Sequence, residues 1–279
     1  MDNNFLGYLG PEGSFSEEAA IKYSSGTSLQ PKPYPAINRV FSAVEQKEVA
    51  LGVVPVENSL EGAVNLTLDL LSLDNPVKIK GELLLKVRHC LLVCPGQELR
   101  GIKEVYSHPQ ALAQCRLFLD KNLPEAARIS RASTAEAVQL VARSEGKAAI
   151  ASRRAAFLYH LEVLRENIQD EPCNITRFLL LDLEDAPPTG HDKTSLLFSL
   201  PDRPGSLYAA LGVFACHKLN ITKIESRPIR GEPGKYIFFL DIAGHRKDKT
   251  MVQALLELKK MALSVKILGS YPLGGQIFL

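Results

Sequence analysis

The pair Pro187-Pro188 divides this chain into two parts whose hydrophobic patterns differ. Two consecutive prolines cannot continue a helix or a strand, and the polar and glycine-containing residues around them are typical of a linker. The 279 residues are enough for two domains, because a domain usually takes about 150 residues. We therefore predict a first domain over residues 1–184, a linker over 185–193 and a second domain over 194–279.

The first part alternates short apolar runs with segments of helical periodicity. This alternation predicts an α/β domain with a mostly parallel sheet. The expected strands are 5–9, 49–54, 87–93, 104–106, 128–130, 148–151 and 178–182. The expected helices begin near residue 14, lie within 59–73, and occupy 109–119, 135–143 and a segment starting at 153.

The second part follows a different order of elements. A strand over 194–200, a helix over 205–218, strands over 221–229 and 235–242, a helix over 249–261 and a strand over 265–268 give the order βαββαβ. That order is the ferredoxin-like arrangement.

Charge and terminal sequence exclude several classes of protein. Lys and Arg total 33 against 31 Asp and Glu, a formal charge of +2, whereas nucleic-acid binders usually carry a clear basic excess. Asp2 stands where a signal peptide would be basic, and no apolar run is long enough for a membrane span. We expect a cytoplasmic protein without nucleic-acid or membrane partners.

Cysteine and glycine patterns exclude the common cofactor sites. The five cysteines are an odd and scattered set, which argues against a disulfide framework. No Cys/His spacing fits zinc, and Gly7, Gly10 and Gly13 match neither the dinucleotide fingerprint nor a P-loop. We expect no metal and no cofactor, which leaves proton transfer and electrostatic stabilisation as the available chemistry.

Small hydroxyl and amide residues recur where the expected strands end. They include Ser14 and Ser16, Glu57-Asn58-Ser59, Ser107-His108 and Ser133-Thr134. Many are ordinary helix caps, but caps do not require Glu57-Asn58-Ser59, or Gln110 and Gln114 on one helix face. Helix N-termini at strand ends attract anions, so the pattern predicts a site for a small anion carrying carboxylates.

Several motifs closely resemble those of prephenate dehydratases. They are Gly10-Pro-Glu-Gly-Ser-Phe-Ser16, Val54-Pro-Val-Glu-Asn-Ser-Leu-Glu-Gly62, Ser107-His-Pro-Gln-Ala-Leu-Ala-Gln-Cys115 and Asn174-Ile-Thr-Arg-Phe178. Leu200-Pro-Asp-Arg-Pro-Gly-Ser-Leu207 and Ile224-Glu-Ser-Arg-Pro228 resemble the ACT regulatory domain of those enzymes. No helical segment like a chorismate mutase precedes the first strand, so the resemblance is to the monofunctional form.

The resemblance implies a fold and a reaction. The catalytic domain is expected to be two-lobed, like a type II periplasmic binding protein, with one lobe over 1–80 plus 173–184 and the other over 81–172. The implied reaction converts prephenate to phenylpyruvate, water and carbon dioxide. A dehydratase acting on arogenate, or a non-catalytic receptor for a small anion, stays open as an alternative.

The resemblance also implies roles for individual residues. Thr176 is expected to donate a hydrogen bond to the departing hydroxyl, with Asn58, Ser107, Gln114 and Glu57 also catalytic, although the role of Glu57 stays open. Arg177, Ser59, Phe178, Ser14 and His108 are expected to bind substrate. His108 is the alternative acid, because the pKa of an unperturbed histidine is about 6.5.

The second domain is expected to sense L-phenylalanine as an allosteric inhibitor. The turn before the helix at 205 has free N–H groups that can receive a carboxylate. The residues expected at this site are Gly205, Ser206, Leu207, Asn220, Ile221, Glu225, Ser226, Arg227 and Pro228. ACT domains generally bind amino acids where two copies meet, so a homodimer or homotetramer is expected.

Overall fold

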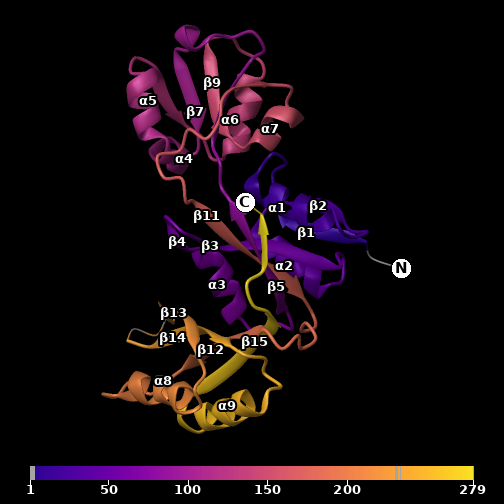
Figure 1. Ribbon diagram of the computed structural model, residues 1–279, viewed down its shortest axis with the longest axis vertical. Coiled ribbons are helices and arrows are strands. Elements are labelled where there is room, and N and C mark those ends of the chain that lie inside the picture. Colours follow the sequence, from indigo (N-terminus) through magenta and orange to yellow (C-terminus); the bar gives the residue numbers. More distant parts are fainter. Residues whose placement is uncertain (1–3, 230–231, 233, 279) are drawn as a thin grey trace.

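The computed structural model describes residues 4–229, 232 and 234–278, and it arranges them as three sheets along one long axis (Figure 1). Two sheets form the lobes of the first part, and the third forms the second domain at the far end. None of the described helices is both long and apolar enough to cross a membrane.

The first lobe is built on a seven-stranded sheet in the order β16-β5-β11-β3-β1-β2, with β4 beside β3. Its strands are β1 (Phe5–Leu9), β2 (Gln30–Tyr34), β3 (Leu51–Asn58), β4 (Gly62–Ala63), β5 (Lys78–Lys86), β11 (Ile175–Asp182) and β16 (Gln276–Phe278). Helix α1 (Phe15–Ser24) packs on one face, and α2 (Ile37–Glu45) and α3 (Asn65–Ser72) pack on the other.

The second lobe has a five-stranded sheet in the order β10-β6-β9-β7-β8. Its strands are β6 (Cys90–Val93), β7 (Glu104–Ser107), β8 (Ala127–Ser130), β9 (Lys147–Ala151) and β10 (Glu162–Arg165). Its helices are η1 (Leu99–Gly101), α4 (Pro109–Gln114), α5 (Arg116–Asn122), α6 (Thr134–Val141) and α7 (Arg153–Leu158). The chain enters this lobe after β5 and leaves it before β11.

Two expectations about these lobes need correction. The sheets are mixed rather than mostly parallel, because β11 runs antiparallel to both β3 and β5, and β6 runs antiparallel to β9 and β10. The expected boundary at residue 80 falls inside β5, a strand that pairs with β11 along its whole length and so belongs to the first lobe.

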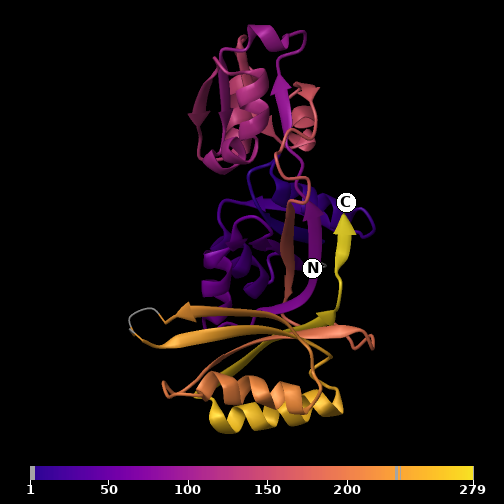
Figure 2. The ribbon, with the colours of Figure 1, turned by 60° about the vertical axis from the view of Figure 1, so that its left-hand side comes forward.

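The second domain is a four-stranded antiparallel sheet in the order β13-β14-β12-β15. It comprises β12 (Asp192–Ser199), α8 (Ser206–Cys216), β13 (Ile221–Pro228), β14 (Tyr236–Ala243), α9 (Lys249–Met261) and β15 (Ser264–Pro272). The βαββαβ prediction is confirmed. Both helices cover one face of the sheet, and the other face meets the first lobe (Figure 2).

The C-terminal segment leaves this domain and returns to the first lobe. Strand β16 pairs in parallel with β5, so it extends the first sheet rather than the third. A Cβ atom on Gly269 would lie 2.1 Å from the carbonyl oxygen of Ile79. The backbone of β15 therefore approaches the first lobe so closely that only glycine fits.

Candidate active site between the lobes

A cleft of about 310 Å³ lies between the two lobes and contains residues from both. It is lined by Phe15, Asn58, Val87, His89, His108, Gln110, Ala111, Gln114, Ala132, Ser133, Thr134, Asn174 and Thr176. None of these described lining residues is Lys, Arg, Asp or Glu. The cleft is therefore polar but, apart from any charge on its two histidines, uncharged.

One hydrogen-bond network joins the strand ends of the first lobe at this cleft. The Asn58 side-chain amide donates to Asn174 Oδ1 at 2.7 Å and to Thr176 Oγ1 at 2.9 Å. The Asn58 Oδ1 atom accepts from the backbone N–H of Leu60 at 3.0 Å, which fixes the amide orientation. Because Thr176 Oγ1 accepts from Asn58 and finds no acceptor among the described residues, its own proton is available to a ligand.

The second lobe joins this network through Gln114. Gln114 Oε1 accepts from Asn174 Nδ2 at 2.9 Å and lies 2.9 Å from His89 Nε2. Gln114 Nε2 donates to Glu61 Oε1 at 3.0 Å, and burial raises the pKa of the Glu61 carboxyl. Gln114 therefore connects a residue of the first lobe, Asn174, to the opposite side of the cleft.

Burial favours the neutral form of His89, and its hydrogen bond to Gln114 defines the tautomer. Burial lowers its pKa, against the smaller opposing effect of the hydrogen bond to Gln114. Since Gln114 Oε1 carries no proton, His89 Nε2 must be the donor. His89 Nδ1 is then unprotonated, and it is buried without a partner among the described residues. The Phe15 ring meets the His89 ring edge-on at 5.5 Å between centroids.

Glu57 and Arg177 lie on the opposite face of the strands that carry Asn58 and Thr176. In the β3–β11 register Asn58 is opposite Thr176 and Glu57 is opposite Arg177. Successive side chains of a strand point to opposite faces, so one pair faces the cleft and the other faces the second domain. Neither Glu57 nor Arg177 lines the cleft.

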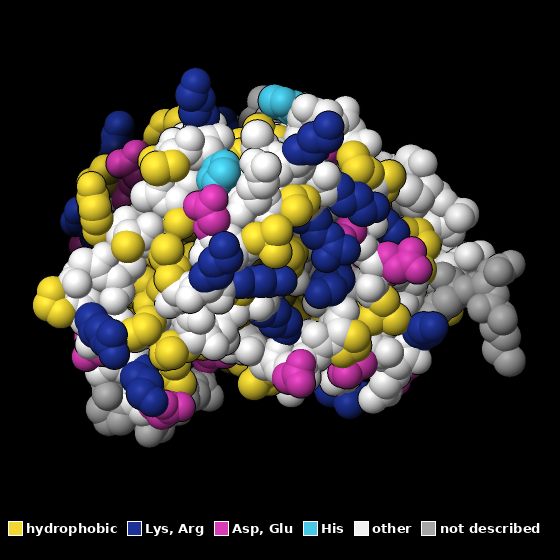
Figure 3. Space-filling view, turned by 90° about the horizontal axis from the view of Figure 1, so that it is seen from below, with side chains coloured by type: hydrophobic (Ala, Val, Ile, Leu, Met, Phe, Trp, Pro, Cys, Tyr) yellow, Lys and Arg dark blue, Asp and Glu magenta, His cyan; other side chains and the backbone are white. Residues whose placement is uncertain are grey.

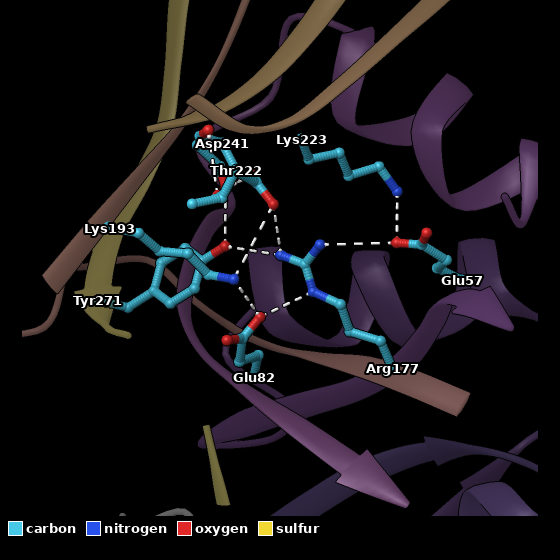
Figure 4. A network of polar contacts seen from close by, with 9 residues as sticks. Glu57, Glu82, Arg177, Lys193, Thr222, Lys223, Asp241 and Tyr271 are labelled. Carbon is cyan, nitrogen blue, oxygen red and sulfur yellow. Dashed lines mark hydrogen bonds and ion pairs between the residues drawn. The ribbon is translucent and has the colours of Figure 1, made fainter. Parts of the chain in front are cut away.

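The Arg177 guanidinium is paired with carboxylates of the protein itself. It donates from Nε to Glu82 at 2.7 Å and from Nη2 to Asp241 at 2.7 Å, and its Nη1 lies 3.7 Å from Glu57 (Figure 4). Burial alone would lower the pKa of Arg177, but Tyr271, Asp241 and Glu82 outweigh it and raise that pKa. The expectation that Arg177 pairs with a substrate carboxylate is corrected, because its guanidinium is already paired outside the cleft.

The other predicted residues take three kinds of position. His108 lines the cleft and caps α4, with Nδ1 accepting from the Gln110 N–H at 3.4 Å. Ser14 and Ser59 are outside the lining: Ser14 caps α1, and Ser59 bonds the Cys173 carbonyl at 3.1 Å. Two are structural and buried: Ser107 Oγ donates to the Ile150 carbonyl at 2.6 Å, and Phe178 packs in the core. None of these four lines the cleft, and their expected catalytic or substrate-binding roles stay predictions.

Sequence reasoning did not name several lining residues as site residues. Asn174 stands two positions before Thr176, and the two-residue period of a strand was a usable signal that both face the cleft. Nothing marks His89 or Val87, because each adjoins apolar strand sequence. Ser133 and Thr134 carried the strand-end pattern, and Ser133 caps α6 by accepting from the Glu136 N–H at 3.0 Å. The first turn of α6 thus presents N–H groups to the cleft.

The second domain has a pocket of its own, of about 130 Å³. It is lined by Leu200, Pro201, Asp202, Arg203, Ser206, Leu207, Gly234, Lys235, Tyr236 and Phe238. Of the residues expected at an amino-acid site, Ser206 and Leu207 line it, and Gly205 precedes α8 with φ of 84°. The residues on β13, and Asn220 before it, lie outside this pocket. Arg227 pairs instead with Asp69 of the first lobe at 3.0 Å.

Comparisons with known proteins cover nearly the whole chain. A family model described as "Prephenate dehydratase" matches residues 6–186, and one described as "ACT domain" matches 194–260. The chain is 46% identical over 267 residues to the bifunctional chorismate mutase/prephenate dehydratase of Aquifex aeolicus, covering 96% of this chain and 73% of that protein.

Two solved structures superimpose closely. Prephenate dehydratase from Arthrobacter aurescens in complex with L-Phe shares 35% identity with a TM-score of 0.89, covering 96% of this chain and 90% of the other. GqqA, described as a novel type of quorum-quenching acylase, shares 32% identity with a TM-score of 0.87, covering 96% and 97%. The first of the two carries the family's name, and both share the fold. This chain belongs to the prephenate dehydratase family, and an ACT domain follows its catalytic part.

Proposed function

We propose that the protein dehydrates and decarboxylates prephenate to phenylpyruvate, and that L-phenylalanine inhibits it through the ACT domain. The observation that carries the proposal is the Thr176 hydroxyl. It accepts a hydrogen bond from Asn58 and retains its proton for a ligand in a cleft between two lobes.

The reaction needs one oriented donor rather than a strong acid. As the bond between the ring and its carboxylate breaks, the electron pair enters the ring, the ring becomes aromatic, and the C–O bond opposite breaks. The departing hydroxide needs a proton to leave as water. The Thr176 hydroxyl donates a hydrogen bond to that oxygen, the Asn58 amide holds the hydroxyl in place, and solvent supplies the proton with which the hydroxide becomes water.

An uncharged cleft suits a carboxylate that must leave as neutral CO₂. A Lys or Arg paired with that group would stabilise the substrate more than the transition state, which would slow the reaction. The second carboxylate of prephenate does not react, and the N–H groups at the first turn of α6 can hold it. Neither carboxylate requires Arg177.

The lining favours prephenate over arogenate. Arogenate carries an ammonium group where prephenate carries a ketone, and a buried ammonium needs a carboxylate partner. No acidic side chain is among the described lining residues. Glu61 adjoins the lining through Gln114, whose Nε2 donates to its Oε1 at 3.0 Å, but Glu61 does not itself line the cleft.

L-Phenylalanine is proposed to bind at the pocket beside α8. The related structure from Arthrobacter aurescens contains L-Phe, and an α-carboxylate can be held at the N-terminus of α8. Strand β13 is the edge of its sheet, so a second copy can bring its β13 residues to the site. Figure 3 shows hydrophobic side chains mixed with Lys and Arg on the end of the molecule that α8 and α9 cover. A homodimer or homotetramer is therefore part of the proposal.

Incubation of the purified protein with prephenate, arogenate or an acyl-homoserine lactone tests the proposal directly. We expect phenylpyruvate from prephenate, much slower formation of phenylalanine from arogenate, and no acyl hydrolysis. Turnover of the lactone alone would favour an acylase over a dehydratase. Binding of prephenate without turnover would favour a receptor.

A further inference from the structure

The contact between the catalytic part and the ACT domain contains a connected network of charges. Asp241 of β14 bonds Arg177 of β11 at 2.7 Å, and Lys223 of β13 bonds Glu57 of β3 at 2.5 Å. Arg177 and Glu57 also lie 3.7 Å apart, so the two links are joined (Figure 4). Glu82 of β5 completes the network by bonding Arg177 at 2.7 Å.

These links end on the residues next to the cleft network. Thr176 and Arg177 are neighbours on β11, and Glu57 and Asn58 are neighbours on β3. On each strand, one residue thus faces the cleft and its neighbour in sequence contacts the ACT domain. A shift of the ACT sheet that moves Asp241 and Lys223 must either break these bonds or displace the two strand ends that carry Asn58 and Thr176.

The centre of the network is buried and its charges balance, whereas the Glu57 side chain at its edge is 38% exposed. Glu57, Glu82 and Asp241 supply three negative charges against Arg177, Lys193 and Lys223. The side chains of Glu82 and Asp241 are 3% and 10% exposed, and that of Arg177 is 14% exposed. A charge left unpaired in such a place is costly, so the bonds are expected to hold until the whole interface moves.

Apolar packing around the network makes the interface stiff. Phe239 and Leu268 of the ACT domain share one core with Leu71, Ile79 and Leu179 of the first lobe. Since packed interiors deform little, displacement at one side of this core is carried to the other.

The ACT strand that holds Asp241 also reaches the amino-acid pocket. Tyr236 and Phe238 line that pocket, and Asp241 stands three positions after Phe238 on β14. In the pairing of β13 with β14, Lys223 is opposite Asp241. One strand therefore connects the pocket to the charge network.

We propose that Asp241, with Lys223, is a positioning residue that sets the placement of Thr176 and Asn58 through Arg177 and Glu57, and so carries the response to L-phenylalanine. This inference rests on the proposed function. Bound amino acid shifts strands β14 and β13. The Asp241–Arg177 and Lys223–Glu57 bonds transmit this shift to β11 and β3, and the Thr176 hydroxyl moves away from the position in which it donates to the substrate. Because the displaced group is a donor to the leaving oxygen, inhibition acts mainly on kcat.

The test compares full-length wild type with Asp241→Asn and Lys223→Gln. Glu257→Gln is the matched control, since Glu257 is an exposed ACT carboxylate whose partner among the described residues is His217 of the same domain, at 3.1 Å. For each protein kcat and KM for prephenate are measured with and without saturating L-phenylalanine. Calorimetry measures L-phenylalanine binding, and hydrogen exchange follows the amides of residues 175–178.

We expect L-phenylalanine to lower kcat of wild type and Glu257→Gln by at least about tenfold, because displacement of a catalytic group by 1 Å can cost about 100-fold. In both network variants the effect should fall below about twofold, while L-phenylalanine affinity changes less than about threefold, since the ligand pocket is intact. Hydrogen exchange at 175–178 should respond to L-phenylalanine in wild type and not in the variants.

A folded Asp241→Asn protein that keeps the full wild-type inhibition would overturn the inference. If Asp241→Asn does not fold, the less buried Lys223→Gln decides in the same way. Absence of prephenate turnover in wild type would refute the proposed function instead. Hydrogen exchange then decides the inference alone: no wild-type response at 175–178 to L-phenylalanine overturns it, and a response lost in the variants supports it.

Discussion

Replacement of Thr176 by valine isolates the hydroxyl from the shape of the side chain. Valine is nearly isosteric with threonine and favours strands, so β11 should keep its pairing with β3. The Asn58 amide loses the acceptor at 2.9 Å but retains Asn174 Oδ1 at 2.7 Å. The loss of one hydrogen bond costs about 1 kcal/mol, which corresponds to a fall in Tm of about 2–4 °C.

The effect on turnover should be far larger than the effect on stability. A positioned donor contributes about 10²–10⁴-fold to the rate, which is about 2.7–5.4 kcal/mol of activation free energy. We therefore expect kcat of Thr176→Val to fall at least about 100-fold, with KM changed little because no carboxylate contact is lost. Thr176→Ser keeps the hydroxyl and should retain kcat within about tenfold.

Stopped-flow or steady-state measurement of phenylpyruvate formation separates these outcomes. Thermal unfolding of each variant confirms that it is folded. A folded Thr176→Val enzyme whose kcat lies within about threefold of wild type would refute the assignment of Thr176 as donor.

Three further results are expected. The pH profile of wild-type kcat should show no essential acid titrating near about pH 6–7, and His108→Ala should have the same profile. A fall of kcat across that pH range in wild type that is absent in His108→Ala would assign the donor role to His108. Gly269→Ala should lower the free energy of unfolding by about 3 kcal/mol or more, because its Cβ would lie 2.1 Å from the Ile79 carbonyl oxygen; Gly212→Ala, where a Cβ meets nothing within 4 Å, is the control in denaturant unfolding. Burial lowers the pKa of His89 below its ordinary 6.5, so the unfolded chain binds the proton more tightly and stability should fall as the pH drops below about 6.5; Tm profiles of wild type and His89→Gln that are parallel would contradict this.

Some elements could not be predicted from their sequence because tertiary position overrides local signals. Strand β2 has the sequence QPKPY, and two prolines normally argue against a strand. It forms because β2 is the edge of its sheet, where one side of the strand needs no ladder partner. Strand β16 pairs with β5 from a distance of almost 200 residues along the chain, and no local pattern reveals such a pairing.

Other elements had a signal that the sequence analysis did not use. Helix α2 places Ile37, Val40, Phe41 and Val44 at the spacing of one helical face, and all four are buried. The split between β5 and β6 was missed because 87–93 was predicted as one strand, although Arg88 and His89 interrupt its apolar residues and the chain passes between the lobes there. Element order in the ACT domain was predictable because short polar or glycine-containing breaks separate its apolar strands from helices with apolar residues at helical spacing, such as Leu207, Leu211 and Phe214.

The site residues divide in the same way. The chemistry of a side chain could be predicted from the sequence, but the strand face on which it lies depended on the strand register. Asn58, Gln114 and Thr176 were predicted and meet at the cleft, but Arg177 was expected beside Thr176 for the same ligand. Residues adjacent in a strand cannot share a face, so a motif that joins a hydroxyl to an arginine must serve two surfaces. In this fold one surface is the cleft and the other is the ACT interface. The motif Thr176-Arg177 therefore joins two surfaces: Thr176 faces the cleft, and Arg177 is bonded by the ACT domain, none of whose described residues lines the cleft.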